Sequence, residues 1–355
     1  MKQNDSHNAI KGPLLVDAIN ISTGGGLVLL KYLCDEIKSN QIDFFIVTDT
    51  NTNPINTDNY AVIHCANSLR ARYGFFAKLE EQLKPSAVFC FGNFPPPLRL
   101  SCPVYTYFHR PAMAKMNLHL ASLSQKVSYR AKRLLLWAWR KNTDIFLFQS
   151  TVVQSNFLAT YGNDISTRIL PFYDVDEYDD LAVSTDRPEK IKNRFVYVSN
   201  DAPHKNHARL LEAWEELNER GVHPQLILTL PAGSRFEEKI GALNNAGCNV
   251  TNIGQVSHQE VLRETLKSEY VIFPSIAETL GLGLVEGFYL GCTVIAADLP
   301  YTREVVIPSF GFDPFSSSSI ANTVIQAMKS SAAPATELVL ANEINDLLGL
   351  LVRGT

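Results

Sequence analysis

The segment PSIAETLGLGLVEGFYLGCTVIAADLP, residues 274–300, carries the clearest sequence evidence for the fold. It begins at the end of the apolar run YVIFP (270–274) and contains a second apolar run, TVIAA (293–297). Nearly continuous apolar runs are typical of parallel strands that helices cover on both faces. A helix is predicted between the two runs, at 283–290. The segment is therefore expected to form a strand–helix–strand unit of an α/β sheet.

The loop between this strand and this helix has groups that suit a phosphate and a sugar. Glu278 follows the strand, Gly281 and Gly283 leave the backbone open, and Glu286 falls in the first turns of the helix. Unpaired N–H groups and the helix dipole favour an anion at such a turn. Two local alternatives stay open. The glutamates can merely cap the helix and complement its dipole, and GLGLVEG is similar to a dinucleotide loop, although it lacks the acidic partner at the expected distance.

The same strand and helix pattern extends along the chain and predicts two domains, since 355 residues exceed one typical core. Further apolar runs lie at 14–21, 43–48, 60–65, 86–92, 104–109, 145–150, 194–199, 225–231 and 250–254. An acidic, aperiodic stretch at 175–193 is the predicted linker. It separates a Rossmann-like domain at 1–174 from a second at 194–335. A final helix within 336–355 is expected to pack back on the first domain.

Composition excludes several classes of protein. The net charge of -4 gives no signature of a nucleic-acid binder, so no nucleic-acid partner is expected. The six cysteines stand singly, without zinc-ligand spacing, and are expected to be reduced, mostly buried thiols. The polar N-terminus lacks the apolar core of a signal peptide, and no apolar run approaches the roughly 20 residues of a membrane span. We expect a cytoplasmic protein.

At this point the sequence resembles a known family. The order PSxxExxxGLxxxEG, then GCTVIAAD and REV, is similar to the donor-binding signature of the retaining GT-B glycosyltransferases of family 4. The resemblance extends to VYVSNDAPHKNHARLLEAW (196–214), NIGQVSHQEVL (252–262), FLFQSTVVQSNF (146–157) and the opening glycine loop. It implies a GT-B fold, with two doubly wound Rossmann-like domains facing a central cleft. It also implies retaining transfer of a hexose-type sugar from a nucleoside-diphosphate sugar, with no cofactor and no metal.

The resemblance also implies roles for individual residues. Glu278 would contact the donor sugar, Glu286 the ribose hydroxyls, and Lys205 the diphosphate, where a cation stabilises charge on the leaving group. His109 matches the family's histidine at the sugar end of the cleft. The implied catalytic residues are His109, Lys205 and Glu278, and the implied donor-binding residues are Gly24, Gly25, Gly26, Gly254, Val256, Thr279, Leu280, Gly281, Leu282 and Glu286.

Taken singly, these residues have simpler explanations. A lysine near a helix start is usually solvated, a triple glycine can be a mobile turn, and a histidine after a strand is more often structural. Two departures from the family pattern also matter. The arginine that precedes the lysine in many members falls at Ser199 or Asn200, with Arg110 or His204 as candidate replacements. The common EGFGLP reads ETLGLG at 278–283, so the donor sugar cannot be inferred.

A basic segment in the first domain suggests a partner. From Arg110 to Asn142 there is no acidic residue, while Lys115, Lys126, Arg130 and other cations recur and Trp137 and Trp139 lie among leucines. Basic charge with interfacial tryptophan suits an anionic membrane. We therefore expect residues 126–141 to dock on the inner leaflet, where a polyprenyl-diphosphate-linked glycan would be the acceptor. The alternative is a helix that packs on its domain with solvated charges.

The sequence leaves competing functions open. The leading hypothesis is a hexosyltransferase of O-antigen, capsule or similar surface-polysaccharide assembly, by analogy with GT-B enzymes of this size. The first alternative is a sugar-nucleotide epimerase or soluble-glucan synthase of the same fold. The second is a degenerate GT-B chain that serves as a binding subunit, which the missing arginine makes conceivable.

Overall fold

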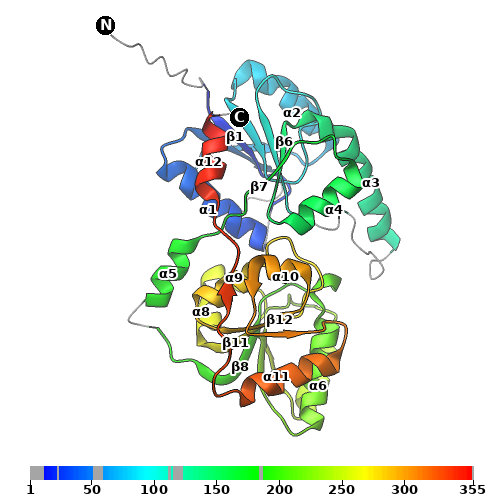
Figure 1. Ribbon diagram of the computed structural model, residues 1–355. Helices are drawn as coiled ribbons and strands as arrows, with labels where there is room; N and C mark the ends of the chain where they lie inside the picture. The colour runs from blue at the N-terminus through cyan, green and yellow to red at the C-terminus, as the bar shows by residue number, and fades with distance from the viewer. Residues whose placement is uncertain are drawn as a thin grey trace. The chain divides into compact units, whose positions relative to one another are not determined.

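The computed structural model describes residues 12–21, 24–50, 59–110, 113–114, 123–183 and 187–353, without the side chains of 123–125. The chain forms two compact units, each an α/β sheet with flanking helices (Figure 1). Unit 1 is Met1–Tyr173 with Asn342–Thr355, and unit 2 is Asp174–Ala341.

Unit 1 contains a parallel sheet in the order β3-β2-β1-β4-β5-β6-β7. The first strand, β1, lies in the middle of the sheet. Strands β2 and β3 extend the sheet on one side of β1, and β4 to β7 extend it on the other. Its strands are β1 (Leu14–Asp17), β2 (Phe44–Asp49), β3 (Val62–Cys65), β4 (Ala87–Cys90), β5 (Val104–Phe108), β6 (Ile145–Phe148) and β7 (Thr167–Ile169). Its helices are α1 (Gly25–Ser39), α2 (Leu69–Gln82), α3 (Leu123–Trp139), α4 (Thr151–Tyr161) and α12 (Ile344–Arg353), with a 3-10 turn at Arg140–Asn142.

Unit 2 repeats this plan in the order β10-β9-β8-β11-β12-β14, also parallel, with a small antiparallel pair β13-β15. Its strands are β8 (Ile191–Tyr197), β9 (Gln225–Leu228), β10 (Asn249–Asn252), β11 (Ser268–Phe273), β12 (Thr293–Ala297), β13 (Val306–Ile307), β14 (Phe310–Phe312) and β15 (Glu337–Leu338). Its helices are α5 (Val175–Val183), α6 (His207–Glu219), α7 (Glu237–Asn245), α8 (His258–Lys267), α9 (Leu282–Tyr289), α10 (Pro300–Val305) and α11 (Ser317–Lys329), with a 3-10 turn at Pro203–Lys205. The prediction of two Rossmann-like α/β units is confirmed.

The segment 274–300 folds as its sequence predicts, from β11 through α9 to β12. The two strands pair in parallel, with Val271 opposite Val294. Gly287 lets α9 approach them closely, because a Cβ atom there would lie 2.9 Å from a methyl group of Val271. The apolar runs are buried because helix and sheet enclose them, which is the physical origin of their continuous hydrophobicity.

The predicted linker at 175–193 is wrong in its first part. Residues 175–183 form α5, which belongs to unit 2 and lies beside α9 (Figure 1). Tyr178 of α5 is fully buried, and its ring centroid lies 5.7 Å from that of Tyr289 in α9. The sequence does not predict this helix because acidic residues dominate its composition, and Tyr178 is its only buried residue.

The end of the chain returns to unit 1. The amide of Asn342 donates a hydrogen bond of 2.9 Å to the Tyr173 carbonyl, and the Glu343 N–H donates one of 2.7 Å to the Pro171 carbonyl. Helix α12 then buries Leu347 and Leu351 and contacts β4. The expected helix within 336–355 is therefore shorter, since β15 occupies its first residues.

Two further sequence expectations concern membranes and thiols. Within the part of the chain that the structure describes, no helix has the length and apolar character needed to cross a bilayer. All six cysteines are free thiols, and five of them are buried. Burial raises the pKa of the Cys102 thiol to about 11, so even this less buried cysteine is protonated at neutral pH.

Candidate functional site

The polar loops of unit 2 gather where the strand order reverses. Strands β8 and β11 are neighbours in the sheet although β9 and β10 lie between them in the sequence, and the loops that follow β8 and β11 carry Lys205 and Glu278. In an open parallel sheet, loops at such a switch point diverge to opposite faces and leave a crevice at the carboxyl ends of the strands. Sheet topology therefore places these two residues at the position where ligands bind in this type of fold.

The turn that carries Lys205 is held against the neighbouring loops. Asn206 adopts a left-handed conformation, and its amide donates hydrogen bonds to the carbonyls of Pro274 (3.1 Å) and Pro314 (2.7 Å). The Ile276 N–H donates to the His204 carbonyl at 2.8 Å. These bonds link the loop after β8 to the loop after β11 and so fix the backbone on which Lys205 and Glu278 stand.

Lys205 and Glu278 form an ion pair. Lys205 Nζ lies 2.6 Å from Glu278 Oε1, and the two side chains are 17% and 11% exposed. An ion pair this far removed from water interacts more strongly than a surface pair. Both charges nevertheless retain some access to solvent. A ligand can therefore replace the contact between the two side chains: an anionic group of the ligand would bind Lys205, and hydroxyl groups of the ligand would donate hydrogen bonds to Glu278.

The structure also answers one question about the missing family arginine. Burial lowers the pKa of His204, and the charge of Lys205 lowers it further against the opposing effect of Glu278. His204 is therefore mainly neutral at pH 7 and does not supply the absent positive charge. Ser199 accepts or donates a 2.8 Å hydrogen bond with His207 Nε2, so its hydroxyl has a structural partner. Arg110 lies in unit 1 and stays a candidate.

Helix α9 begins at a glycine turn beside Glu278. Gly281 is its N-cap and has a φ of 71°, a left-handed conformation that favours glycine. The Leu284 N–H bonds back to the Gly281 carbonyl at 2.8 Å, while no side chain caps the helix and its first turn carries no acidic residue. The N–H groups at this end thus remain suited to an anion. Thr279 and Leu282 are half-buried beside it, and Leu280 is buried.

Glu286 lies further along α9, and it is almost completely buried. Its residue exposure is 3%, and its Oε1 lies 2.9 Å from Nε2 of His258, the first residue of α8. The opposite ring nitrogen, Nδ1, lies 3.4 Å from Glu177 Oε2 in α5. The prediction that Glu286 belongs to a polar site is consistent with this geometry, but neither His258 nor Glu177 was identified from the sequence.

Gly254 and Val256 lie in the loop between β10 and α8. Gly254 has a φ of 78°, and its N–H donates to Asn252 Oδ1 at 3.3 Å. The Asn252 side chain is itself paired with both backbone groups of Leu230, at 2.8 and 3.1 Å. The loop is therefore fixed at the end of the neighbouring strand β9, and it leads directly into His258.

The remaining predicted site residues belong to unit 1. Gly24 is the N-cap of α1, with a φ of 69° and no side-chain cap, and Gly25 is the first helical residue. A Cβ atom on Gly26 would lie 3.4 Å from Cε1 of His109, so the glycine loop and the histidine are in contact. Residues 22 and 23 of this loop lie outside the described residues. The topology of unit 1 thus brings together Gly24, Gly25, Gly26 and His109, as expected for loops after β1 and β5.

His109 is held in one tautomer. Its Nε2 lies 2.8 Å from the Phe91 carbonyl, which can only accept, so Nε2 carries the proton and Nδ1 is the acceptor. The backbone N–H donates to Asn93 Oδ1 at 2.7 Å, and the ring stacks on Phe91 with centroids 5.0 Å apart. Burial lowers the pKa of His109 to about 4. At neutral pH this side chain is an uncharged hydrogen-bond acceptor toward the glycine loop.

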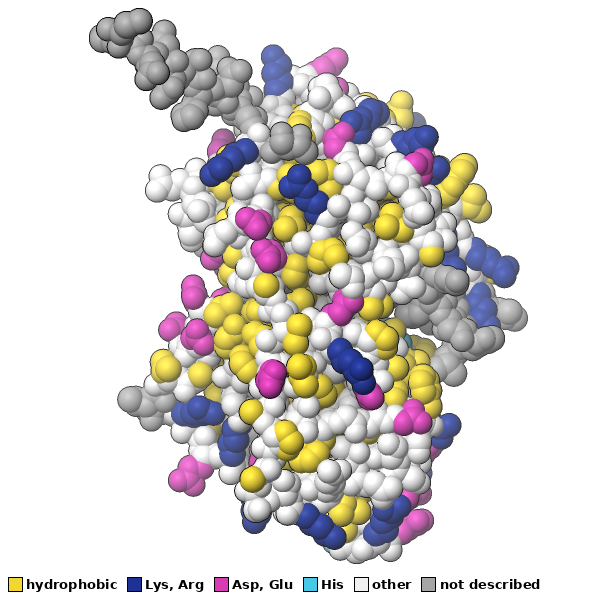
Figure 2. Space-filling model, in the orientation of Figure 1, with side chains coloured by type: hydrophobic (Ala, Val, Ile, Leu, Met, Phe, Trp, Pro, Cys, Tyr) yellow, Lys and Arg dark blue, Asp and Glu magenta, His cyan; other side chains and the backbone are white. Residues whose placement is uncertain are grey.

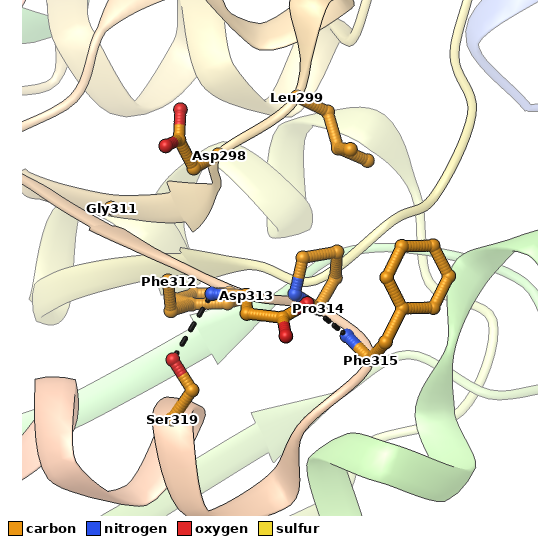
Figure 3. Close-up of a pocket in the computed structure, with 8 residues that line it drawn as sticks. All are labelled: Asp298, Leu299, Gly311, Phe312, Asp313, Pro314, Phe315 and Ser319. Atoms are coloured by element: carbon orange, nitrogen blue, oxygen red, sulfur yellow. Dashed lines mark hydrogen bonds between the residues drawn. The ribbon is translucent and has the colours of Figure 1, made fainter.

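A separate pocket in unit 2 has a volume of about 280 Å³ (Figure 3). It lies at the ends of β12 and β14, where Asp313 accepts a hydrogen bond from the Phe315 N–H and its own N–H donates to Ser319. It does not include Lys205, Glu278 or Glu286. Its lining residues are Asp298, Leu299, Gly311, Phe312, Asp313, Pro314, Phe315 and Ser319.

Comparisons with known proteins agree with this fold. Residues 184–338, most of unit 2, match the family model described as Glycosyl transferases group 1. A search of curated proteins finds no match. The two parallel α/β units and the structural relatives described next confirm the GT-B fold class.

The particular relatives are distant in sequence. Sucrose-phosphate synthase from Thermosynechococcus elongatus is 17% identical with a TM-score of 0.70, and the match covers 96% of this chain and 95% of that chain. An E. coli trehalose-6-phosphate protein bound with UDP-2-fluoro glucose is 12% identical, with a TM-score of 0.67 and coverage of 97% and 96%. Anabaena HepE, in complex with UDP and glucose, is 14% identical, with a TM-score of 0.64 and coverage of 96% and 95%.

Proposed function

We propose that this protein is a retaining glycosyltransferase of family 4 that transfers a hexose-type sugar from a nucleoside-diphosphate sugar to a glycan acceptor. The observation that carries the proposal is the Lys205–Glu278 pair at the switch point of unit 2, beside the uncapped start of α9. The group 1 match over the same unit and the UDP-bound structural relatives support it.

In the proposed reaction, Lys205 and the N–H groups near Gly281 bind the diphosphate. As the bond from the anomeric carbon to the diphosphate breaks, the leaving group gains negative charge, which oriented donors stabilise without reorganisation. The acceptor oxygen bonds to the same face of that carbon, and its proton passes to a diphosphate oxygen. Glu278 would bind sugar hydroxyls of the donor. No metal ion or cofactor has a role in this proposal.

The acceptor defines two versions of the proposal. We favour a polyprenyl-diphosphate-linked glycan of O-antigen or capsule assembly, because unit 1 presents a basic helix suited to a membrane. A soluble sugar or sugar phosphate is the second candidate, since the structural relatives include a sucrose-phosphate synthase. Product analysis with labelled donor and each acceptor class separates the two versions.

The donor site is tested by ligand binding. Binding raises apparent stability by mass action, so at least one of UDP, GDP and ADP, or a sugar derivative, should raise the melting temperature. Glu286→Ala should lower the affinity for that nucleotide about 10 to 100-fold, because a hydrogen bond to a charged group is worth about 1.5–3 kcal/mol. The exposed Glu219→Ala is the matched control in unit 2. Failure of every nucleotide to stabilise the wild type would contradict the proposed function.

The proposed membrane contact rests on α3. Three apolar side chains on its outer surface are strongly exposed, namely Val127 (65%), Leu134 (68%) and Trp137 (52%). Arg130 is exposed between them on α3, and Lys141 is exposed in the 3-10 turn that follows the helix, so apolar and basic groups lie close together on this surface. Figure 2 shows dark-blue Lys and Arg side chains along the edge of unit 1 where α3 lies. This mixture suits the interface of an anionic bilayer. Lys115 lies outside the described residues.

Replacing Lys126, Arg130 and Lys141 by glutamine should weaken binding to vesicles of phosphatidylglycerol and phosphatidylcholine about 100-fold, at about 1 kcal/mol per basic residue. Co-sedimentation measures the bound fraction. The triple change of Lys31, Arg70 and Lys78 to glutamine is the control, because these exposed residues of unit 1 give the same change in net charge. Equal binding by the two variants would exclude α3 as the docking face.

A further inference from the structure

His258 lies between two carboxylates that come from different helices. Its Nε2 lies 2.9 Å from Oε1 of Glu286 in α9, and its Nδ1 lies 3.4 Å from Oε2 of Glu177 in α5. The imidazole is 23% exposed, while the Glu286 side chain is only 4% exposed. The three side chains therefore form a row that runs from the surface of unit 2 to a buried carboxylate.

The location of His258 disfavours a positive charge. It is the first residue of α8, where the helix dipole repels a cation. Burial also lowers the pKa of His258, but hydrogen bonds and charges from Glu177 and Glu286 outweigh burial and raise that pKa to about 10. The side chain is then an imidazolium at neutral pH. Its Nε2–H donates to Glu286, and Nδ1 forms an ion pair with Glu177.

This arrangement has a consequence for Glu286. The imidazolium compensates a carboxylate that is nearly removed from water, where an isolated charge would be costly. It also occupies Oε1 and so fixes the plane of the carboxylate. Among the described residues, the second oxygen, Oε2, has no hydrogen-bond partner. One oxygen is thus held by the protein, and the other is available to a ligand.

We propose that His258, held in turn by Glu177, is a positioning residue that orients the Glu286 carboxylate toward the vicinal hydroxyls of a ribose and thereby sets the preference for ribonucleotides over 2′-deoxyribonucleotides. This inference rests on the proposed function, in which Glu286 binds the nucleotide. A site built to bind a hydroxyl discriminates against the analogue that lacks it, because its polar group is then left unpaired.

A role in stability alone is the alternative, and the structure shows why it is the weaker explanation. Helix α5 is already attached to α9 through the buried contact of Tyr178 with Tyr289, at 5.7 Å between ring centroids. The attachment of α5 does not require an ion pair to a buried carboxylate. A purely structural role would also affect every ligand of the site equally, whereas orientation of Glu286 acts through the ribose hydroxyls.

Isothermal titration calorimetry with UDP and 2′-deoxy-UDP tests the inference, with GDP or ADP and their 2′-deoxy forms if the wild type binds those instead. His258→Leu should weaken binding of the ribonucleotide about 10-fold and of the deoxy form less than about 3-fold. Glu177→Gln should act in the same direction with a smaller effect. His223→Leu, at an exposed residue of unit 2, is the matched control and should leave both affinities unchanged.

The outcomes are distinguishable. An equal loss for both nucleotides, or no loss for either, overturns the positioning role while the proposed function stands. A wild type that binds no nucleoside diphosphate overturns the proposed function, and this inference with it. If His258→Leu does not fold, His258→Gln keeps a side-chain donor to Glu286, and a smaller loss restricted to the ribonucleotide is then expected.

Discussion

Lys205→Met should lower the turnover of the sugar donor about 100 to 1000-fold, the effect of removing one donor that stabilises developing charge. The physical reason is the position of Lys205, whose Nζ lies 2.6 Å from Glu278 and beside the uncapped start of α9. Methionine keeps the length and apolar stem of the side chain but removes the charge. The diphosphate would then leave with only N–H groups to stabilise it, while ground-state binding of the donor should weaken less than turnover.

Release of labelled nucleoside diphosphate from the donor, with and without acceptor, measures this effect. Lys239→Met is the matched control, because Lys239 pairs with Glu215 on the surface of the same unit, at 2.5 Å. The control should retain full turnover, since exposed ion pairs contribute little. Glu278→Gln should lower turnover and spare nucleotide affinity. If both Lys205→Met and Glu278→Gln keep wild-type turnover, the assignment of Lys205 and Glu278 to the donor site is wrong.

The sequence predicts the sheets well because burial leaves a direct pattern in it. The runs that become β11 and β12 are apolar at almost every position, and the helix between them begins at a glycine turn. Short elements have no such pattern. Strands β13 and β15 have two residues each. Their pairing depends on backbone hydrogen bonds, which place little constraint on the side chains, so the sequence contains no pattern that predicts it.

The candidate site could be predicted only in part, for a related reason. Lys205 and Glu278 follow strands that are neighbours at a switch point, so a topological rule brings them together. The contacts of Glu286 follow no such rule. His258 starts a helix, where a cation is not expected, and Glu177 lies in a segment whose acidic composition indicates a linker. The contacts of His258 and Glu177 with Glu286 depend on how α5, α8 and α9 pack, and no local sequence pattern predicts that packing.

A buried ion pair in unit 1 should have a large effect on stability. Arg72 of α2 contacts Asp17 at the end of β1 through two hydrogen bonds, Nη2 to Oδ2 at 2.7 Å and Nη1 to Oδ1 at 3.3 Å. Both side chains are at most 5% exposed. Asp17 Oδ1 also accepts a hydrogen bond from the Ile19 N–H, at 3.3 Å, in the segment that leads to the glycine loop. The pair thus attaches α2 to the strand that precedes Gly24.

Arg72→Met should lower the free energy of unfolding of unit 1 by about 3–5 kcal/mol, because it leaves the Asp17 carboxylate buried without a counter-charge. The melting temperature of that unit should fall by roughly 10 °C, since about 1 kcal/mol corresponds to about 2–4 °C in a domain of this size. Calorimetry of the full chain measures both. Arg70→Met, on the exposed face of the same helix, should change stability by less than about 0.5 kcal/mol.

The double variant Asp17→Asn with Arg72→Met separates the ion pair from the packing of the arginine stem. Asparagine keeps an oxygen that can accept from the Ile19 N–H but carries no charge, so the double variant should regain more than half of the stability that Arg72→Met loses. This recovery is expected because the cost of the single change lies in the uncompensated carboxylate rather than in the lost attraction. If the double variant is less stable than Arg72→Met, the loss comes instead from the packing of Arg72 over the Phe76 ring, 5.5 Å from its centroid.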